Sequence, residues 1–185
     1  MRKSMSQNHD ALLTRHFSNV TLERCDQIAR ATAQLVTRWH AQPSMARRGI
    51  RLWLRGELGA GKTTWVRSFL QACGITGRIK SPSFSVVESY EHDGRWYHHL
   101  DFYRQSDPNT WQSAGLRDII GEAAVTLIEW PERAHGLPEP HIQVGLGWSS
   151  SAQGDTPREI TIAFFARQDG PGLQPLLAQW STQCE

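Results

Sequence analysis

The sequence is poor in the features that mark secreted, metal-stapled and membrane-spanning proteins. Its 185 residues include three cysteines, Cys25, Cys73 and Cys184, too few and too widely spaced for a disulfide framework or a zinc site. No stretch approaches the roughly 20 consecutive apolar residues of a transmembrane helix, and the polar N-terminus lacks the apolar segment of a secretory signal. We therefore expect reduced thiols, a cytoplasmic protein and no membrane contact.

An excess of either charge is also missing. The chain has 20 basic and 18 acidic residues, and its net charge of +2 is too small to indicate nucleic-acid binding by itself. Its histidines show no metal-ligand spacing. The length is that of one domain, so we expect a single unit over residues 1–185, with residues 1–12 mobile. We expect the isolated protein to be a monomer.

Lysine is scarce as well, and one of the three lysines completes a glycine-rich motif. Residues 56–63 read GELGAGKT, which matches the phosphate-binding loop G-x-x-x-x-G-K-[ST]. The glycines let the backbone turn its N–H groups toward one anion. Lys62 is then expected to reach the β- and γ-phosphates of a nucleotide, and the Thr63 hydroxyl to bind the Mg²⁺ that bridges them.

The flanking segments have the order that this loop requires. Residues 50–54 have a strand pattern, and residues 64–70 carry apolar side chains at helical spacing. Asp93–Gly94 is a hairpin turn signal between strand patterns at 84–90 and 96–100. The sequence therefore predicts an α/β, P-loop NTPase-type three-layer fold, with a mostly parallel central sheet and an antiparallel hairpin after the first βα unit.

The remaining periodicities predict the outer elements. Residues 123–128 are apolar on both faces, as in a central parallel strand. Asp107 and Pro108 are the cap and first residue of a helix that runs to residue 120 with an interruption at Gly115. Further strands are predicted at 14–19, 141–148 and 158–165, and further helices at 22–39 and 173–180.

Glu129 follows the apolar strand and is the second candidate site residue. P-loop folds place a carboxylate at the C-terminal edge of the sheet, opposite the phosphate loop. Mg²⁺ prefers oxygen ligands, so Thr63, Glu129 and phosphate oxygens fit it, directly or through water. The alternative is an ordinary surface glutamate at a strand end, which the neighbouring motif makes the weaker interpretation.

Alternation in the second hairpin strand places His99, Asp101 and Tyr103 on one face. Asp101 is a candidate for orienting the attacking water or for holding a Mg²⁺-bound water. Arg104 is a candidate for contacting phosphate or a partner. A capping aspartate and a surface arginine explain the same residues equally well.

Residues 81–84 are predicted to form a loop, because Pro82 fixes its own φ and keeps Ser81 out of the helical region. In several P-loop hydrolases a loop at this place becomes ordered around the γ-phosphate and relaxes after hydrolysis. Trp130, directly after Glu129, is expected to pack over the site or bind a partner, with a core aromatic as the alternative.

Two missing motifs narrow the activity. The chain has no N-K-x-D guanine-reading motif, which argues against a GTPase, and no arginine-rich lid, which argues against a small-molecule kinase. Three functions remain: an ATPase with a conformational output, a small-molecule kinase, and a binding module that senses nucleotide without hydrolysis.

Taken in order, four motifs resemble the TsaE (YjeE) family of bacterial P-loop ATPases, which act in the synthesis of N6-threonylcarbamoyladenosine (t6A) in tRNA. The motifs are residues 56–64, 80–84, 99–104 and 128–130, and the resemblance spans roughly residues 14–148. Ser83 departs from the family's usual threonine but keeps the hydroxyl.

The resemblance implies a subunit required for t6A formation at adenosine 37 of tRNA, with ATP and Mg²⁺ as cofactors. Such a subunit hydrolyses ATP weakly alone, works with TsaB and TsaD to reset the modification cycle, and meets tRNA indirectly through that complex.

The resemblance also assigns roles to residues. It assigns catalysis to Lys62, Asp101 and Glu129, and Mg²⁺ binding to Thr63 and Glu129. The implied phosphate ligands are Gly59, Ala60, Gly61, Lys62, Thr63 and Thr64. The implied switch and partner residues are Ser81, Pro82, Ser83, Phe84 and Trp130. The implied adenine pocket lies near Val20 and near Pro157–Arg158.

Overall fold

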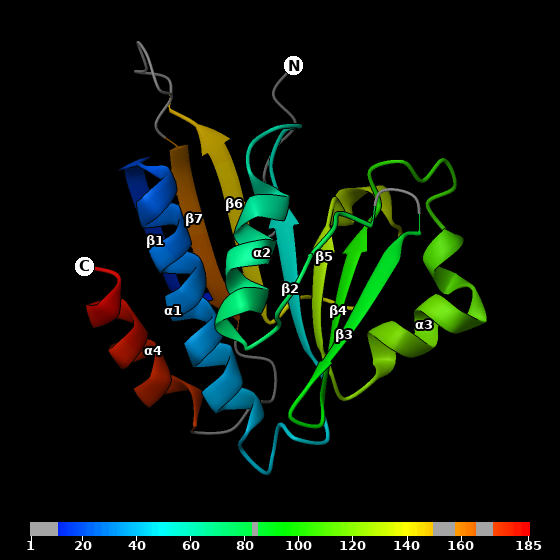
Figure 1. The fold of residues 1–185 in the computed structure, drawn as a ribbon, viewed down its shortest axis with the longest axis horizontal. Coiled ribbons are helices and arrows are strands. Elements are labelled where there is room, and N and C mark those ends of the chain that lie inside the picture. The colour runs from blue at the N-terminus through cyan, green and yellow to red at the C-terminus, as the bar shows by residue number, and fades with distance from the viewer. Residues whose placement is uncertain (1–10, 83–84, 150–157, 166–171) are drawn as a thin grey trace.

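The computed structural model describes residues 11–82, 85–149, 158–165 and 172–185, and its centre is a seven-stranded sheet of order β1-β7-β6-β2-β5-β4-β3 (Figure 1). The strands are β1 (Ala11–Val20), β2 (Ile50–Arg55), β3 (Val87–His92), β4 (Arg95–Asp101), β5 (Val125–Glu129), β6 (Ile142–Trp148) and β7 (Arg158–Phe165). β6, β2, β5 and β4 are parallel neighbours, whereas β7 is antiparallel to β6 and β1, and β3 is antiparallel to β4. The sheet is therefore mostly parallel, as predicted.

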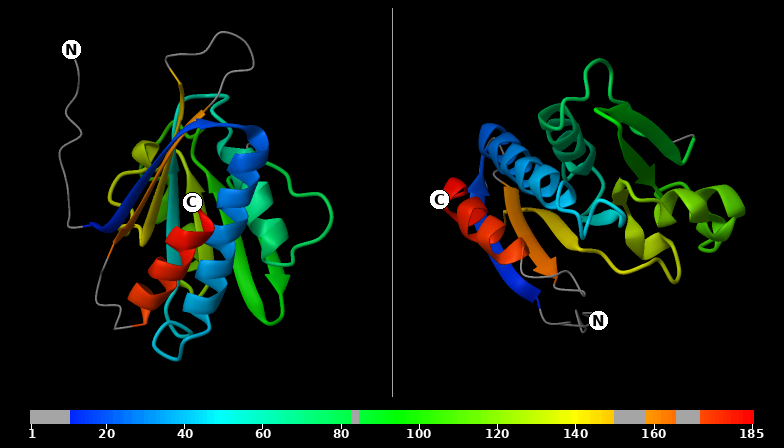
Figure 2. Two further views of the ribbon diagram at one scale, coloured as in Figure 1. Left: turned by 90° about the vertical axis from the view of Figure 1, so that its left-hand side faces the viewer. Right: turned by 90° about the horizontal axis from the view of Figure 1, so that it is seen from below.

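Three helices cover one face of this sheet: α1 (Leu22–His40), α2 (Lys62–Ala72) and α4 (Leu173–Gln183) (Figures 1 and 2). α1 begins where the Thr21 hydroxyl accepts a hydrogen bond from the Arg24 N–H, at 3.1 Å. Apolar side chains recur at spacings of three and four residues along α1, and the stripe that they form faces the strands. Buried members of this core include Ile28, Val36, Leu52, Phe69, Leu127 and Ile162.

A smaller layer covers the other face, beside β5 and β4. It consists of α3 (Ala114–Gly121) and the 3₁₀ turns η1 (Thr110–Gln112) and η2 (Pro131–Arg133). Its buried side chains are Leu100, Phe102, Trp111, Ile120, Ile128, Ala134 and Leu137. The two cores on opposite faces confirm the predicted three-layer arrangement.

The predicted hairpin is present. β3 and β4 pair from Val87 opposite Leu100 to His92 opposite Arg95, and the turn consists of Asp93 and Gly94. Both turn residues have positive φ, 51° and 71°, as a two-residue hairpin loop requires.

Several element boundaries differ from the sequence prediction. The predicted helix start at Asp107 and Pro108 is wrong, because η1 begins only at Thr110 and the α-helix only at Ala114. β1 already begins at Ala11, so residues 11 and 12, expected to be mobile, are in a strand, and residues 1–10 lie outside the described part of the chain. β3 begins at Val87 instead of residue 84. The interruption between η1 and α3 is at Ser113, whose backbone is extended (φ −56°, ψ 144°), whereas Gly115 lies inside α3. A single glycine is a weak helix breaker, and the extended residue leaves the helical conformation altogether.

The thiols of Cys25, Cys73 and Cys184 are buried and unpaired, as expected. None of the helices within the ranges described above is long and apolar enough to cross a membrane.

A buried hydrogen bond joins α1 to α4. The Trp180 indole N–H donates to the Thr32 hydroxyl at 3.1 Å, and that hydroxyl donates to the Ile28 carbonyl at 2.8 Å. Thr32 is fully buried and Trp180 nearly so. The hydroxyl is the acceptor for the indole N–H at this helix contact.

We predict that Thr32→Val lowers the free energy of unfolding by about 1–3 kcal/mol, because it leaves the buried Trp180 N–H without an acceptor. Urea denaturation measures this loss. In a Trp180→Phe background the same substitution should cost less, since no indole N–H remains. An equal cost in both backgrounds would contradict the role given to this hydrogen bond.

Candidate functional site

The candidate site lies at the carboxyl edge of the parallel strands, where three chain segments end at one level. The glycine loop follows β2 and leads into α2. In the sheet register Leu54 lies beside Glu129, and Glu129 lies beside Asp101. Asp101 and Glu129 end β4 and β5, so the structure brings both carboxylates and the loop together.

The loop takes the backbone conformation that its glycines allow. Gly56, Gly59 and Gly61 have φ of 145°, 81° and 100°. A Cβ on Gly56 would lie 2.2 Å from the Leu146 carbonyl oxygen, so the loop leaves β2 in close contact with β6. Gly61 then precedes the first turn of α2, where free backbone N–H groups and the helix dipole favour an anion.

Lys62 points back into this loop. Its ammonium donates to the carbonyl oxygens of Gly56 and Glu57, at 2.7 and 2.9 Å. It also lies 3.9 Å from the centre of the Trp130 ring, a cation–π distance. Lys62 is 4% exposed, and burial lowers its pKa, against the opposing charge of Glu129.

Glu129 is held by two hydrogen bonds, one on each carboxylate oxygen. The Thr63 hydroxyl donates to Oε2 at 3.1 Å, and His99 Nε2 lies 2.9 Å from Oε1. Glu129 is 2% exposed, so the carboxylate depends on these partners. His99 was not among the predicted site residues. The alternation that placed it on the same face as Asp101 was the available signal.

Asp101 is also held at both oxygens. Oδ1 accepts from the Tyr103 backbone N–H at 2.9 Å, and Oδ2 accepts from the Ser81 hydroxyl at 3.1 Å. Burial raises the pKa of Asp101, and the nearby charge of Glu129 adds to the rise, while the two hydrogen bonds oppose it. Asp101 thus caps the turn after β4 and, at the same time, lies beside the phosphate loop.

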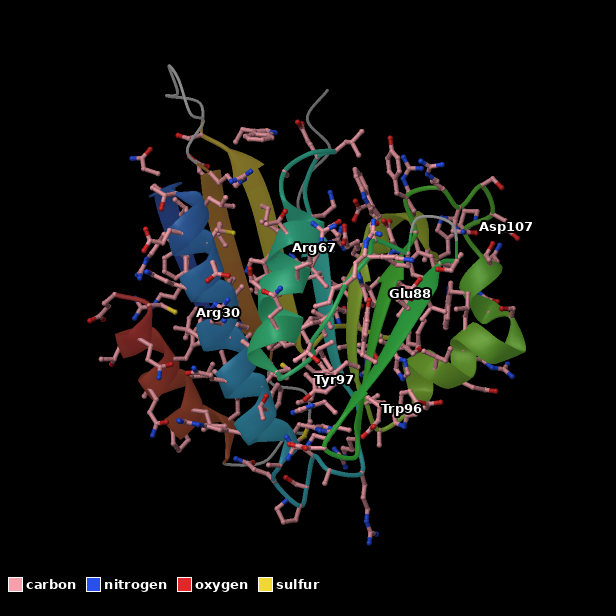
Figure 3. All side chains as sticks on the ribbon, in the orientation of Figure 1. Arg30, Arg67, Glu88, Trp96, Tyr97 and Asp107 are labelled. Atoms are coloured by element: carbon pink, nitrogen blue, oxygen red, sulfur yellow. The ribbon has the colours of Figure 1, made fainter. Side chains whose placement is uncertain are left out.

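The segment that precedes residues 83–84 is attached to the site. Arg67, labelled on α2 in Figure 3, donates through Nε to the Ile79 carbonyl at 3.1 Å. Two residues later Ser81 reaches Asp101, and Pro82 is buried. The predicted switch residues Ser83 and Phe84 lie outside the described residues.

Trp130 lies between the phosphate loop and the surface. Its backbone is left-handed (φ 57°, ψ 48°), which turns its half-buried ring beside Lys62. The ring centre is 4.9 Å from that of Tyr103. Arg133 lies over both rings, at 5.4 and 4.8 Å, and donates to the Tyr103 carbonyl at 2.6 Å. The sequence analysis missed Arg133, and no motif marks it.

Arg158 and Trp148 flank the other side of the loop. Arg158 begins β7, pairs with Val20, and lies 5.4 Å from the centre of the Trp148 ring. A Cβ on Gly61 would lie 3.3 Å from Arg158 Nε. Of the residues expected near the adenine, Arg158 therefore lies beside the phosphate loop and Val20 is its strand partner, whereas Pro157 is outside the described residues.

The side-chain oxygens of Thr63 and Glu129 suit Mg²⁺ as ligands. A hydroxyl and a carboxylate oxygen 3.1 Å apart are oxygen ligands of the kind that Mg²⁺ uses together with phosphate and water. Within the described ranges, no group of three or more His, Cys, Asp and Glu side chains could hold a metal ion by itself. The arrangement fits a Mg²⁺ that a nucleotide brings, rather than an all-protein cage.

Comparison with known proteins gives the same picture. A family model described as "Threonylcarbamoyl adenosine biosynthesis protein TsaE" matches residues 21–158. A Haemophilus influenzae protein named tRNA threonylcarbamoyladenosine biosynthesis protein TsaE is 37% identical over 122 residues, 65% of this chain and 74% of that protein. The protein of the same name from Treponema pallidum is 32% identical over 134 residues, 71% of this chain and 96% of that protein.

A solved structure is similar over nearly the whole chain. YdiB of Bacillus subtilis superposes with a TM-score of 0.57 at 25% identity, covering 94% of this chain and 97% of YdiB. The family match includes the glycine loop, Asp101 and Glu129, the same residues that the sheet edge brings together. The chain therefore belongs to the TsaE family of threonylcarbamoyl adenosine biosynthesis proteins.

Proposed function

We propose that this protein is the ATPase subunit required for t6A formation at adenosine 37 of tRNA, and that it hydrolyses ATP with Mg²⁺. The hydrogen bond between Thr63 and Glu129 carries the proposal, because it joins the phosphate loop to the carboxylate at the end of β5. That pairing is what phosphoryl transfer by P-loop proteins requires. Family membership supports the role in tRNA modification.

Each residue has a role that follows from its position. The backbone of residues 59–64 binds the phosphates, and Lys62 exchanges the carbonyls of Gly56 and Glu57 for phosphate oxygens. Thr63 and Glu129 would hold Mg²⁺, which when bound would neutralise charge on the phosphate oxygens. Asp101, at the end of the neighbouring strand, would orient the attacking water.

A series of contacts between neighbouring residues connects the phosphate loop to Ser81, the first residue of the predicted switch. When Lys62 turns to phosphate, its contact with Trp130 loosens, and Trp130 packs on Tyr103. The Tyr103 N–H holds Asp101, and Asp101 holds Ser81. Loss or gain of the γ-phosphate therefore reaches Ser81 through four adjacent contacts.

The output of this switch is an interaction with the TsaB–TsaD pair. The partner contact is proposed at Ser81 and Trp130, whose contacts change with the nucleotide, so hydrolysis alters the affinity for the pair and resets the modification cycle. The isolated protein is then a single-domain monomer with weak turnover, acts in the cytoplasm, and meets tRNA through the complex.

The base of the nucleotide lies on the Arg158 side of the loop. The Trp148 ring and the Arg158 guanidinium offer stacking and cation–π contacts to a purine, and Val20 pairs with Arg158 at the same place.

Lys62→Ala is expected to weaken ATP binding and to lower kcat by about 10²–10³-fold, because it removes the cation that faces the transferred phosphate. The matched control is Arg47→Ala, which removes an exposed cation from the loop before β2. Turnover of radiolabelled ATP is measured alone and with the TsaB–TsaD pair, which should raise it.

The products of the same assay distinguish the alternatives. Free phosphate is the expected product, whereas a phosphorylated small molecule would identify a kinase. Tight ATP binding with no turnover, even with the partner pair, would identify a nucleotide-sensing module. Unchanged binding and turnover in Lys62→Ala would show that the site is elsewhere.

Asp101→Asn is expected to lower kcat by about 10²-fold or more, because it removes the group that orients water.

The same substitution should also stabilise the nucleotide-free protein. Burial raises the folded-state pKa of Asp101 above its ordinary 3.8, so the wild type loses stability as the pH rises from 3.8 through the folded-state pKa, and the variant does not. Urea denaturation across a pH series measures the difference.

The control for Asp101→Asn is Asp107→Asn, a change at an exposed aspartate that is labelled in Figure 3. Asparagine can still accept the Asn109 N–H there, so turnover and stability should stay near the wild type. A wild type more stable than Asp101→Asn at neutral pH, by a margin that widens with pH, would contradict the burial argument.

A further inference from the structure

His99 is a buried histidine that contacts the candidate site through one ring nitrogen. It is fully buried in β4, and Nε2 lies 2.9 Å from Glu129 Oε1. The other ring nitrogen, Nδ1, is buried and has no hydrogen-bond partner. The two nitrogens therefore differ, because one faces a carboxylate oxygen and the other has no hydrogen-bond partner.

This asymmetry assigns the hydrogen to Nε2. An Nδ1–H tautomer would bury a donor without an acceptor and would point the Nε2 lone pair at a carboxylate oxygen. The Nε2–H tautomer avoids both costs, because it donates to Oε1 and leaves an unpaired acceptor at Nδ1. His99 thus donates a hydrogen bond to Glu129.

The two carboxylate oxygens of Glu129 therefore have different hydrogen-bond partners. His99 occupies Oε1 from within the sheet, and Thr63 occupies Oε2 from the phosphate loop. A carboxylate fixed at one oxygen cannot rotate freely, so Oε2 stays on the side of Thr63. A second donor behind a metal-binding carboxylate has this effect in metal sites generally.

We propose that His99 is a positioning residue, which through Nε2–H orients the Glu129 carboxylate toward Mg²⁺. The proposal rests on the proposed function, in that Glu129 receives Mg²⁺ together with Thr63. It predicts that His99 affects the Mg²⁺-dependent part of nucleotide binding, and leaves the phosphate loop itself intact.

Two substitutions of similar size test the hydrogen bond. Glutamine can place an amide N–H where Nε2 lies, whereas the shorter asparagine reaches only to the position of Nδ1. The measurement is the affinity for a fluorescent ADP analogue, with Mg²⁺ and with EDTA. We expect His99→Asn to lower the Mg²⁺-dependent gain in affinity by about 10–100-fold, and His99→Gln to keep most of it. The affinity in EDTA should change little in either variant.

His98 provides the matched control. It is the preceding residue of the same strand, is 3% exposed, and lies on the opposite face of the sheet. Its Nε2 lies 3.1 Å from Glu122 and its Nδ1 lies 2.8 Å from Ser89, so it also bonds to a glutamate. His98→Asn should cost stability and leave the Mg²⁺-dependent gain unchanged.

The outcomes distinguish a failure of the role proposed for His99 from a failure of the proposed metal site. Equal Mg²⁺-dependent gains in His99→Asn, His99→Gln and the wild type would overturn the role of His99. A wild type that binds the analogue equally with Mg²⁺ and with EDTA would instead contradict the proposed metal site. If His99→Asn does not fold, a loss of the gain in the folded His99→Gln variant would overturn the proposal.

Discussion

The parallel register of β2, β5 and β4 is the constraint on which the rest of the site depends. It places Leu54, Glu129 and Asp101 at one level, so the loop that leaves β2 meets the carboxylates that end the next two strands. Side chains alternate along a strand, and a slip of one residue in β5 would turn Glu129 toward the layer that contains α3. The apolar residues of β5, buried on both faces, oppose such a slip.

The same register brings buried polar groups close together. Lys62, His99, Asp101 and Glu129 are each at most 7% exposed, although the interior disfavours their charged forms. Hydrogen bonds from Thr63, Ser81, His99 and the Tyr103 backbone satisfy the two carboxylates, and two loop carbonyls satisfy the lysine. The arrangement sacrifices stability for a preorganised polar cluster, which is typical of a functional site.

Local patterns predicted most of the fold. The hairpin turn at Asp93–Gly94, the amphipathic helix from Leu22 and the strand at 158–165 each depend on residues near in sequence, and each was confirmed. The boundaries that were predicted wrongly are not set by a short sequence pattern. The start of β1 depends on the pairing of Ala11 with Phe165 of β7, which is far away in the sequence. The break between η1 and α3 is at Ser113, where no glycine or proline marks it.

The sequence by itself determined the phosphate loop, the strand before it, the helix after it, and the acidic residues at two strand ends. These features are local, because they follow from glycine conformation, hydrophobic period and chain order. Tertiary structure alone decided which side chains touch: Lys62 against Trp130, Ser81 against Asp101, His99 behind Glu129 and Arg158 beside Gly61. Each of these contacts joins different strands and loops, so it exists only once the register of the sheet has fixed their distance.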